Sequence, residues 1–286
     1  AIFEKRIFPD GFCYQSGVKM KARDKFQELN LSNAFLFAAV MNDAEVCRLV
    51  LEILTGEPVE AVNVQSEQSI LFSSDFRSVR LDVYARDCLE VEYDLEMENG
   101  GESLPKRSRY YQSQMDVAAL KPGDDVDLLG LSYVIFLCTF DPFDEGLYRY
   151  RFENICTETG NSLGDGTKKI FLNTRGRTKK DVSEELLHFL AYVENTTDEC
   201  AALYNDRKLD RIHRKVKELK ASREWRARYM KFEELLSKER EEGQFAGEKR
   251  MLALVRAMLQ DNRSDEIPLL ETDEKLREEL FREYHI

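Results

Sequence analysis

The chain has 286 residues, of which 43% are hydrophobic and 34% are charged, and its formal net charge is −12. This composition is typical of a globular protein that has either one good-sized domain with an appendage or two small domains. The acidic balance excludes a protein that is coated in basic surface. Two segments are nevertheless basic: residues 168–180 hold six Lys or Arg and no acid, and residues 207–231 hold eleven against three acids. Such segments can bind a polyanion locally.

The cysteines and histidines give no sign of a zinc or redox site. None of the six cysteines has the C-x-x-C spacing, and the three histidines are scattered along the chain. The N-terminus lacks the basic and apolar pattern of a signal peptide. The longest apolar run, Leu128–Phe140, is too short to cross a bilayer. We therefore expect a cytoplasmic protein with no membrane partner.

The periodicity of apolar residues predicts a mixed α/β core followed by helices. Residues 1–30 are polar and interrupted by Pro and Gly, so we expect an irregular lead-in. The next elements are predicted in the order helix, three strands, helix, strand, at residues 33–54 (interrupted at 42–43), 58–64, 79–86, 89–98, 105–121 and 133–138. Shorter strands are predicted at 147–152 and 170–173, and helices at 182–194, 198–245 with breaks, 248–261 and 272–284. This order predicts an α/β domain with a mixed sheet over residues 31–200 and a helical C-terminal region over 201–286.

The most informative segment is Leu89–Glu98, in which apolar and acidic residues alternate without a break. Alternation with period two places all the acids on one face of a strand. The preceding strand also alternates and carries Asp82 as its acid. If the two strands form a hairpin, Asp82 shares an open face with Asp94, Glu96 and Glu98. Because like charges repel across a sheet, this face needs bulk water, basic neighbours or a bound cation.

Two interpretations of the acidic face follow. It is either a solvated face that protects the sheet against edge pairing, or a site for a divalent metal. Mg²⁺ prefers oxygen ligands and commonly takes only one or two carboxylates from a protein. Asp82 and Glu96 would supply that minimum, and Glu98 would lie on the same face to orient or activate a water molecule. Glu90 and Glu92 are interpreted as surface acids outside the site.

Several segments in order resemble the PD-(D/E)XK nuclease superfamily, and within it the Rpn branch of recombination-promoting nucleases, a group also described as transposases. The similar segments are Phe35–Met41, Arg80–Val83, Leu95–Glu98, Pro105–Ser113, Tyr133–Phe136, Phe140–Phe143 and Phe171–Asn173. The resemblance runs from about residue 28 to about residue 200, and the helical tail also looks similar. It implies a restriction-endonuclease-like core with an α-helical C-terminal tail. It also implies a metal-dependent DNA endonuclease that hydrolyses phosphodiester bonds, with Asp82 and Glu96 as ligands of Mg²⁺ or Mn²⁺.

Two positions depart from the family pattern. The superfamily's lysine, usually glutamine in this branch, is Glu98 here, which adds a negative charge beside the expected metal. The acidic residue usual in the first helix appears as Asn33, which can coordinate through its carbonyl but brings no charge. These departures keep an alternative open, in which a catalytically impaired nuclease fold serves as a nucleic-acid or protein-binding module. A purely structural helical adaptor is a third, weaker interpretation.

Residues outside the acidic face are assigned by their surroundings. Gln112 is either a solvated helix position or an accessory contact of the site. The DNA-binding candidates lie where no apolar residue needs burial, at Arg175, Arg177, Lys179 and Lys180. The basic segment 207–231 has apolar residues near helical spacing, which predicts an amphipathic helix that packs on the core or on a partner. The C-terminal helices are expected to contact DNA or to form a homo-oligomer.

Overall fold

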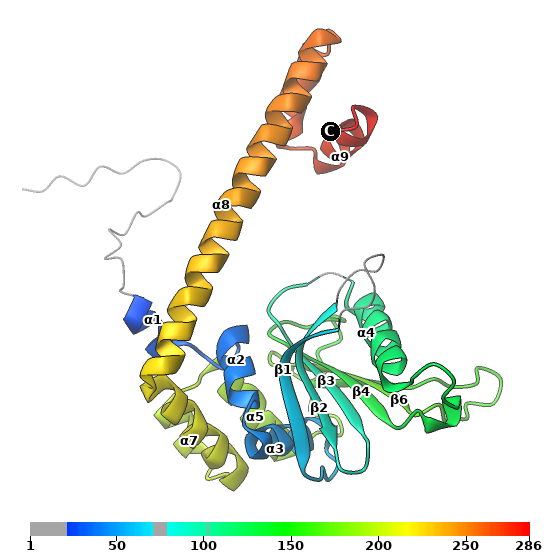
Figure 1. The fold of residues 1–286 in the computed structure, drawn as a ribbon, viewed down its shortest axis with the longest axis vertical. Helices are drawn as coiled ribbons and strands as arrows, with labels where there is room; N and C mark the ends of the chain where they lie inside the picture. The colour runs from blue at the N-terminus through cyan, green and yellow to red at the C-terminus, as the bar shows by residue number, and fades with distance from the viewer. Residues whose placement is uncertain (1–21, 71–78, 102) are drawn as a thin grey trace, which may run out of the picture. The chain divides into compact units, whose positions relative to one another are not determined.

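The computed structural model describes residues 22–70, 79–101 and 103–286, and it describes side chains outside residues 22–24, 66–70, 79–82 and 239. Helices and strands alternate in the first half, and helices follow in the second (Figure 1). The strands are β1 (Val62–Ile70), β2 (Val79–Asp87), β3 (Glu92–Glu98), β4 (Ser132–Cys138), β5 (Arg149–Phe152) and β6 (Thr167–Asn173). The α-helices are α1 (Ala22–Glu28), α2 (Ala34–Met41), α3 (Ala44–Thr55), α4 (Leu104–Ala119), α5 (Glu184–Glu194), α6 (Asp198–Leu203), α7 (Arg207–Ala221), α8 (Arg223–Gln260) and α9 (Glu274–Glu283). Two 3₁₀ helices, η1 (Val126–Leu128) and η2 (Ser264–Glu271), complete the described elements.

The six strands form one mixed sheet in the order β1-β2-β3-β4-β6-β5. Strands β1, β2 and β3 run antiparallel as neighbours, so the predicted hairpin between the two alternating strands is confirmed. Strands β3, β4 and β6 run parallel, and β5 returns antiparallel at the edge. The parallel strands therefore end at one common edge of the sheet. This mixed sheet, followed by C-terminal helices, confirms the predicted fold class.

The two faces of the sheet are covered by different helices (Figure 1). Side chains such as Leu95 and Ile135 pack into the larger hydrophobic core, to which α2, α3, α5 and α7 contribute. The opposite face carries Phe136 and Phe171, which form a smaller core beneath Met115 of α4. Strand β4 is buried along its whole length, which explains why its sequence is apolar on both faces.

Polar side chains mark the beginnings of the helices beside the larger core. The break at residues 42–43 exists because the Asp43 carboxylate accepts a hydrogen bond from the Val46 amide and caps α3. Asp206 caps α7 in the same way, with bonds from the amides of Lys208 and Leu209. These caps satisfy backbone donors that lack a partner within the helix.

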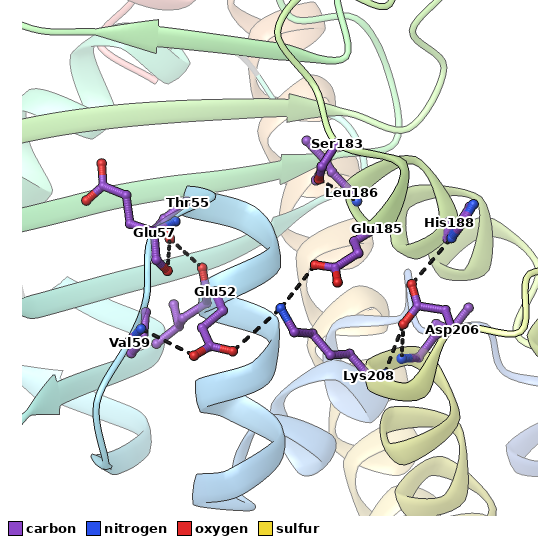
Figure 2. A network of polar contacts seen from close by, with 12 residues as sticks. Glu52, Thr55, Glu57, Val59, Ser183, Glu185, Leu186, His188, Asp206 and Lys208 are labelled. Carbon is purple, nitrogen blue, oxygen red and sulfur yellow. Dashed lines mark hydrogen bonds and ion pairs between the residues drawn. The ribbon is translucent and has the colours of Figure 1, made fainter.

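A polar network connects α3, α5 and α7 (Figure 2). The ammonium group of Lys208 lies 3.0 Å from Glu185 and 3.7 Å from Glu52, and Asp206 lies 3.3 Å from a ring nitrogen of His188. Helix α7 also buries an apolar face formed by Leu209, Ile212, Val216 and Leu219. The first part of the basic segment 207–231 is therefore a helix that packs on the core, with its charges at the surface.

Two predictions about the helices are wrong. The described end of the expected irregular lead-in, Ala22–Glu28, forms helix α1. The expected break between residues 245 and 248 is wrong, because α8 runs unbroken from Arg223 to Gln260. A Cβ atom added at Gly243 or Gly247 would meet nothing within 4 Å, so the two glycines mark no close approach or turn.

The chain divides into two compact units between Trp225 and Arg226. The second unit has its own small core around Leu254 and Phe281. None of the described helices has the length and apolar character needed to cross a membrane.

The cap of α3 gives a test of stability. Hydrogen bonds from the Val46 amide and from Lys215 outweigh the effect of burial and lower the pKa of Asp43. We expect Asp43→Ala to lower the free energy of unfolding by about 1 kcal/mol, and Asp43→Asn to lower it less, since asparagine also caps. A carboxyl with a lowered pKa stabilises the fold above its ordinary pKa of 3.8 and stops doing so as the pH falls further. Urea unfolding from pH 7 to pH 3 should show wild type approaching Asp43→Asn at the acidic end, and a constant difference would contradict the assignment.

Candidate active site

The acids of β3 do not face solvent, as an open sheet face would require. Glu92, Asp94, Glu96 and Glu98 are all buried, with exposed fractions of 6%, 0%, 4% and 9%. They lie on the sheet face that α4 covers, which the ion pairs of the α4 residue Arg107 with Glu96 and Glu98 establish. The interpretation as a solvated face is therefore wrong for the described residues. Burial of so many carboxylates is unfavourable unless cations and hydrogen-bond donors compensate them.

Arg107 of α4 compensates the two acids at the end of β3. One guanidinium nitrogen forms a close ion pair with Glu98, and the other lies 3.5 Å from Glu96. The Tyr111 hydroxyl accepts hydrogen bonds from Nε and Nη2 of the same guanidinium, both at 3.3 Å. The guanidinium carbon also lies 5.3 Å from the ring centre of Phe136. Burial alone would lower the pKa of Arg107, but the hydrogen bonds with Tyr111 and Glu98 outweigh burial and raise it.

Gly101, Tyr111 and Cys138 lie next to this ion pair. A Cβ atom added to Gly101 would lie 2.6 Å from a carboxylate oxygen of Glu98, so only glycine fits against it without displacement. Burial and the negative charge of Glu96 raise the pKa of the Tyr111 hydroxyl, which is therefore protonated at neutral pH. Burial and Glu98 raise the pKa of the Cys138 thiol to about 12, so this cysteine is not a nucleophile.

Glu92 belongs to a separate ion pair. Its carboxylate lies 2.5 Å from a guanidinium nitrogen of Arg86, its register partner on β2. The prediction that Glu92 is a surface acid is wrong, but its exclusion from the site is consistent with this pairing. Glu90 lies in the turn before β3 and is exposed.

Gln112 is not a solvated residue. It is 6% exposed, and its amide nitrogen donates to the Ser132 hydroxyl at 2.7 Å and to Asp116 at 2.9 Å. Ser132 is the register partner of Glu92, whereas Arg107 contacts the other end of β3. Gln112 therefore lies at the amino end of the strand, and the structure does not bring it to Glu96 and Glu98.

Asn33 and the predicted DNA-binding residues lie near the edge where the parallel strands end. Asn33 caps α2, and the preceding residue, Ser32, accepts a hydrogen bond at 2.8 Å from Asn99, which follows β3. The loop after β6 carries the basic candidates at the same edge, and all four are exposed: Arg175, Arg177, Lys179 and Lys180. Arg175 lies 3.7 Å from Glu194, and Lys179 lies 3.6 Å from Glu184. Such exposed pairs are weak and do not prevent contact with a phosphate.

Asp82 lies in β2, but its side chain is outside the described residues. Among the residues whose side chains are described, no three His, Cys, Asp or Glu groups are arranged to hold a metal ion. The carboxylate oxygens of Glu96 and Glu98 have the chemistry that Mg²⁺ and Mn²⁺ prefer. A metal bound here would need further ligands besides Glu96, such as the Asp82 carboxylate, water or a phosphate.

Arg107 is the residue at this site that sequence analysis did not identify. It lies within the segment Pro105–Ser113, which carries part of the family resemblance. The segment contains several basic residues, and the sequence does not say which of them faces the strand. The available signal was the group of basic residues in the helix that follows the acidic strand.

The ion pair of Arg107 leads to a test of stability. Arg107→Met leaves two buried carboxylates without this cation, and we expect it to lower the free energy of unfolding by about 2 kcal/mol at pH 7. The loss should shrink at low pH, where the carboxylates take up protons. Adding Glu98→Gln to Arg107→Met should recover part of the loss, because one buried charge is removed. Urea unfolding of the two single variants and the double variant measures this coupling, and strictly additive effects would contradict it.

The comparison with known families agrees with this geometry. A model of the PD-(D/E)XK nuclease family transposases matches residues 35–242, a span that includes the whole sheet, α4 and the acidic strand. Neither curated proteins nor solved structures give a match to the chain. The family supports a nuclease or transposase-like function, and PD-(D/E)XK nucleases generally use divalent metals. Because the match covers more than half of its length, the chain belongs to the PD-(D/E)XK nuclease family transposases.

Proposed function

We propose that the protein is a metal-dependent DNA endonuclease that hydrolyses phosphodiester bonds. The observation that carries the proposal is the row of buried carboxylates on β3, next to a cation held by α4, in a chain of this family. Val83 pairs with Leu95, and a continuation of this antiparallel register would place the backbone of Asp82 opposite that of Glu96. Asp82 and Glu96 would hold Mg²⁺ or Mn²⁺, which would make a water molecule more acidic and polarise the phosphoryl oxygen.

Arg107 would take the part that the superfamily gives to its lysine. Its guanidinium adjoins both Glu96 and Glu98, where it would face the non-bridging oxygens of a bound phosphate. Glu98 would position this guanidinium through their ion pair instead of coordinating metal. The basic loop with Arg175, Arg177, Lys179 and Lys180 would contact the DNA backbone beyond the site.

The metal ligands are tested by plasmid cleavage. Purified protein is incubated with supercoiled plasmid and Mg²⁺ or Mn²⁺, and nicked product is measured over time. We expect Asp82→Asn and Glu96→Gln to lower the rate of cleavage by about 100-fold or more, because each removes a negative charge from the ligands that would hold the metal. The matched control is Glu92→Gln, which lies on the same strand and face but pairs with Arg86, and it should retain activity. Equal nicking by wild type and both site variants, or none by any protein, would overturn the proposal.

The roles of Glu98 and Arg107 are separated by a second set of variants. We expect Arg107→Met to lower the cleavage rate by about 100-fold, because it removes the cation that faces the phosphate. Glu98→Gln should lower it by less than about tenfold, since glutamine still accepts a hydrogen bond from Arg107. A larger loss in Glu98→Gln than in Arg107→Met, measured in the same plasmid assay, would assign Glu98 as a metal ligand or base.

The alternative function is a binding module that has lost catalysis. The observation that favours it is that Arg107 already engages the carboxylates, as a bound cation would. Binding of DNA without cleavage in either metal would support this alternative. The C-terminal unit would then mediate self-association through exposed apolar residues of α8 such as Phe245 and Leu252, which are 70% and 68% exposed. Light scattering of the full chain would measure that association.

A further inference from the structure

An aromatic pocket lies on the same face of the sheet as the acids, between α4 and the edge formed by β5 and β6. Its volume is about 500 Å³, and its floor is formed by Phe143, Phe152 and Phe171. The ring of Phe152 lies 5.2 Å from Phe143 and 5.6 Å from Phe171, centre to centre. Phe171 is buried, whereas Phe152 is 44% exposed. The pocket therefore offers an accessible aromatic surface on a rigid base of packed rings.

Two basic side chains, Lys169 and Arg109, border these rings. Lys169 is the register partner of Phe152, so both side chains leave the same face of the sheet. Arg109 of α4 borders the pocket from the other side. Within the part of the chain that the structure describes, neither Lys169 nor Arg109 forms an ion pair, although Glu153 also lines the pocket. The rings and the two cations together form a surface that suits a flat, anionic ligand.

A second pocket, of about 420 Å³, continues on the far side of Phe143 and Phe152, which line both pockets. Its basic residues are Arg149, Arg151 and Lys180, and its acids are Glu145 and Asp181. Burial and the nearby Arg151 guanidinium lower the pKa of Arg149. Arg149 donates hydrogen bonds to the backbone carbonyls of Thr55 and Asp181, so Arg151 and Lys180 are the cations left to face an anion in this pocket. Lys180 also belongs to the basic loop that was predicted to bind DNA.

The pockets adjoin the acidic face through α4 and a row of rings. Pro105 and Ser108 line the aromatic pocket, while Arg107 of the same helical turn faces Glu96 and Glu98. The guanidinium of Arg107 lies over Phe136, whose ring stacks on Phe171 at 5.3 Å. A strand whose phosphate lies at the acidic face could therefore place a neighbouring nucleotide in the aromatic pocket.

We propose that this pocket is a nucleotide subsite that holds an unstacked base of single-stranded DNA against Phe152, with Lys169 and Arg109 near its phosphates. The second pocket would bind the next phosphate through Arg151 and Lys180. Stacking on an aromatic side chain accepts any base, so the subsite selects single-stranded or distorted DNA and not a sequence. The subsite rests on the proposed nuclease function for its substrate, but its binding is measured without cleavage.

The test is the binding of a fluorescent 12-nucleotide oligo-dT to the full chain in EDTA, followed by anisotropy. We expect Phe152→Ala to weaken binding about tenfold, since stacking of one base contributes about five- to 100-fold. Phe152→Tyr keeps the ring and should bind as wild type does. An oligonucleotide of the same length and charge with abasic sites should bind wild type and Phe152→Ala equally, because it has no base to stack.

Lysine variants separate the subsite from general electrostatic attraction. Lys169→Gln should weaken the binding of oligo-dT more than Lys121→Gln, an exposed lysine at the far end of α4. No binding by wild type, unchanged binding by Phe152→Ala, or an equal loss on abasic DNA would overturn the subsite. Because metal is absent, a Phe152 effect without plasmid cleavage would uphold the subsite while the nuclease proposal fails. Plasmid cleavage together with unchanged oligo-dT binding by Phe152→Ala would uphold the nuclease proposal and overturn the subsite.

Discussion

The burial of four carboxylates on one strand is the constraint on which this site depends. A strand with an acid at every second position, covered by a helix, is stable only if the helix and the neighbouring strand supply cations. Arg86 compensates Glu92 from β2, and Arg107 compensates Glu98 and Glu96 from α4. The ion pairs of Arg107 therefore both hold α4 on the sheet and balance the negative charge of the site. A change that removes the acids would also remove a reason for α4 to lie where it does.

The same interaction bears on the departure from the family pattern at Glu98. A glutamine at this position is neutral, and the pair formed by Glu98 and Arg107 also has no net charge. We infer that Arg107 restores the charge balance that a glutamate alone would disturb beside a metal and a phosphate. The pair differs from glutamine in holding a cation at a fixed place. Asn33 has a different explanation, because its side chain caps α2 through the Leu36 amide.

Sequence patterns predicted the fold more fully than the site. The alternation in β2 and β3 and the apolar run of β4 follow directly from strand geometry, so the hairpin beside the acids and a mixed sheet could be inferred. The break at Asp43 was visible because capping has a sequence signal. The helix that covers the acidic face could not be predicted, because no local sequence pattern indicates which helix packs on which side of a sheet. The partners of Gln112 and Arg107 depend on that long-range packing. The continuity of α8 does not, because a Cβ atom at Gly243 or Gly247 would meet nothing within 4 Å.

Arg107 connects the acidic face to the aromatic rings, and this position has a physical consequence. Its guanidinium interacts with two carboxylates, with the Tyr111 hydroxyl and with the face of Phe136. If Glu96 held a divalent cation, Arg107 would keep its closer ion pair with Glu98 and its contact with the face of Phe136. Those two contacts would hold the guanidinium beside the acidic face, where it could bind a phosphate. In this arrangement the charge that stabilises the buried carboxylates is the charge that would bind the substrate.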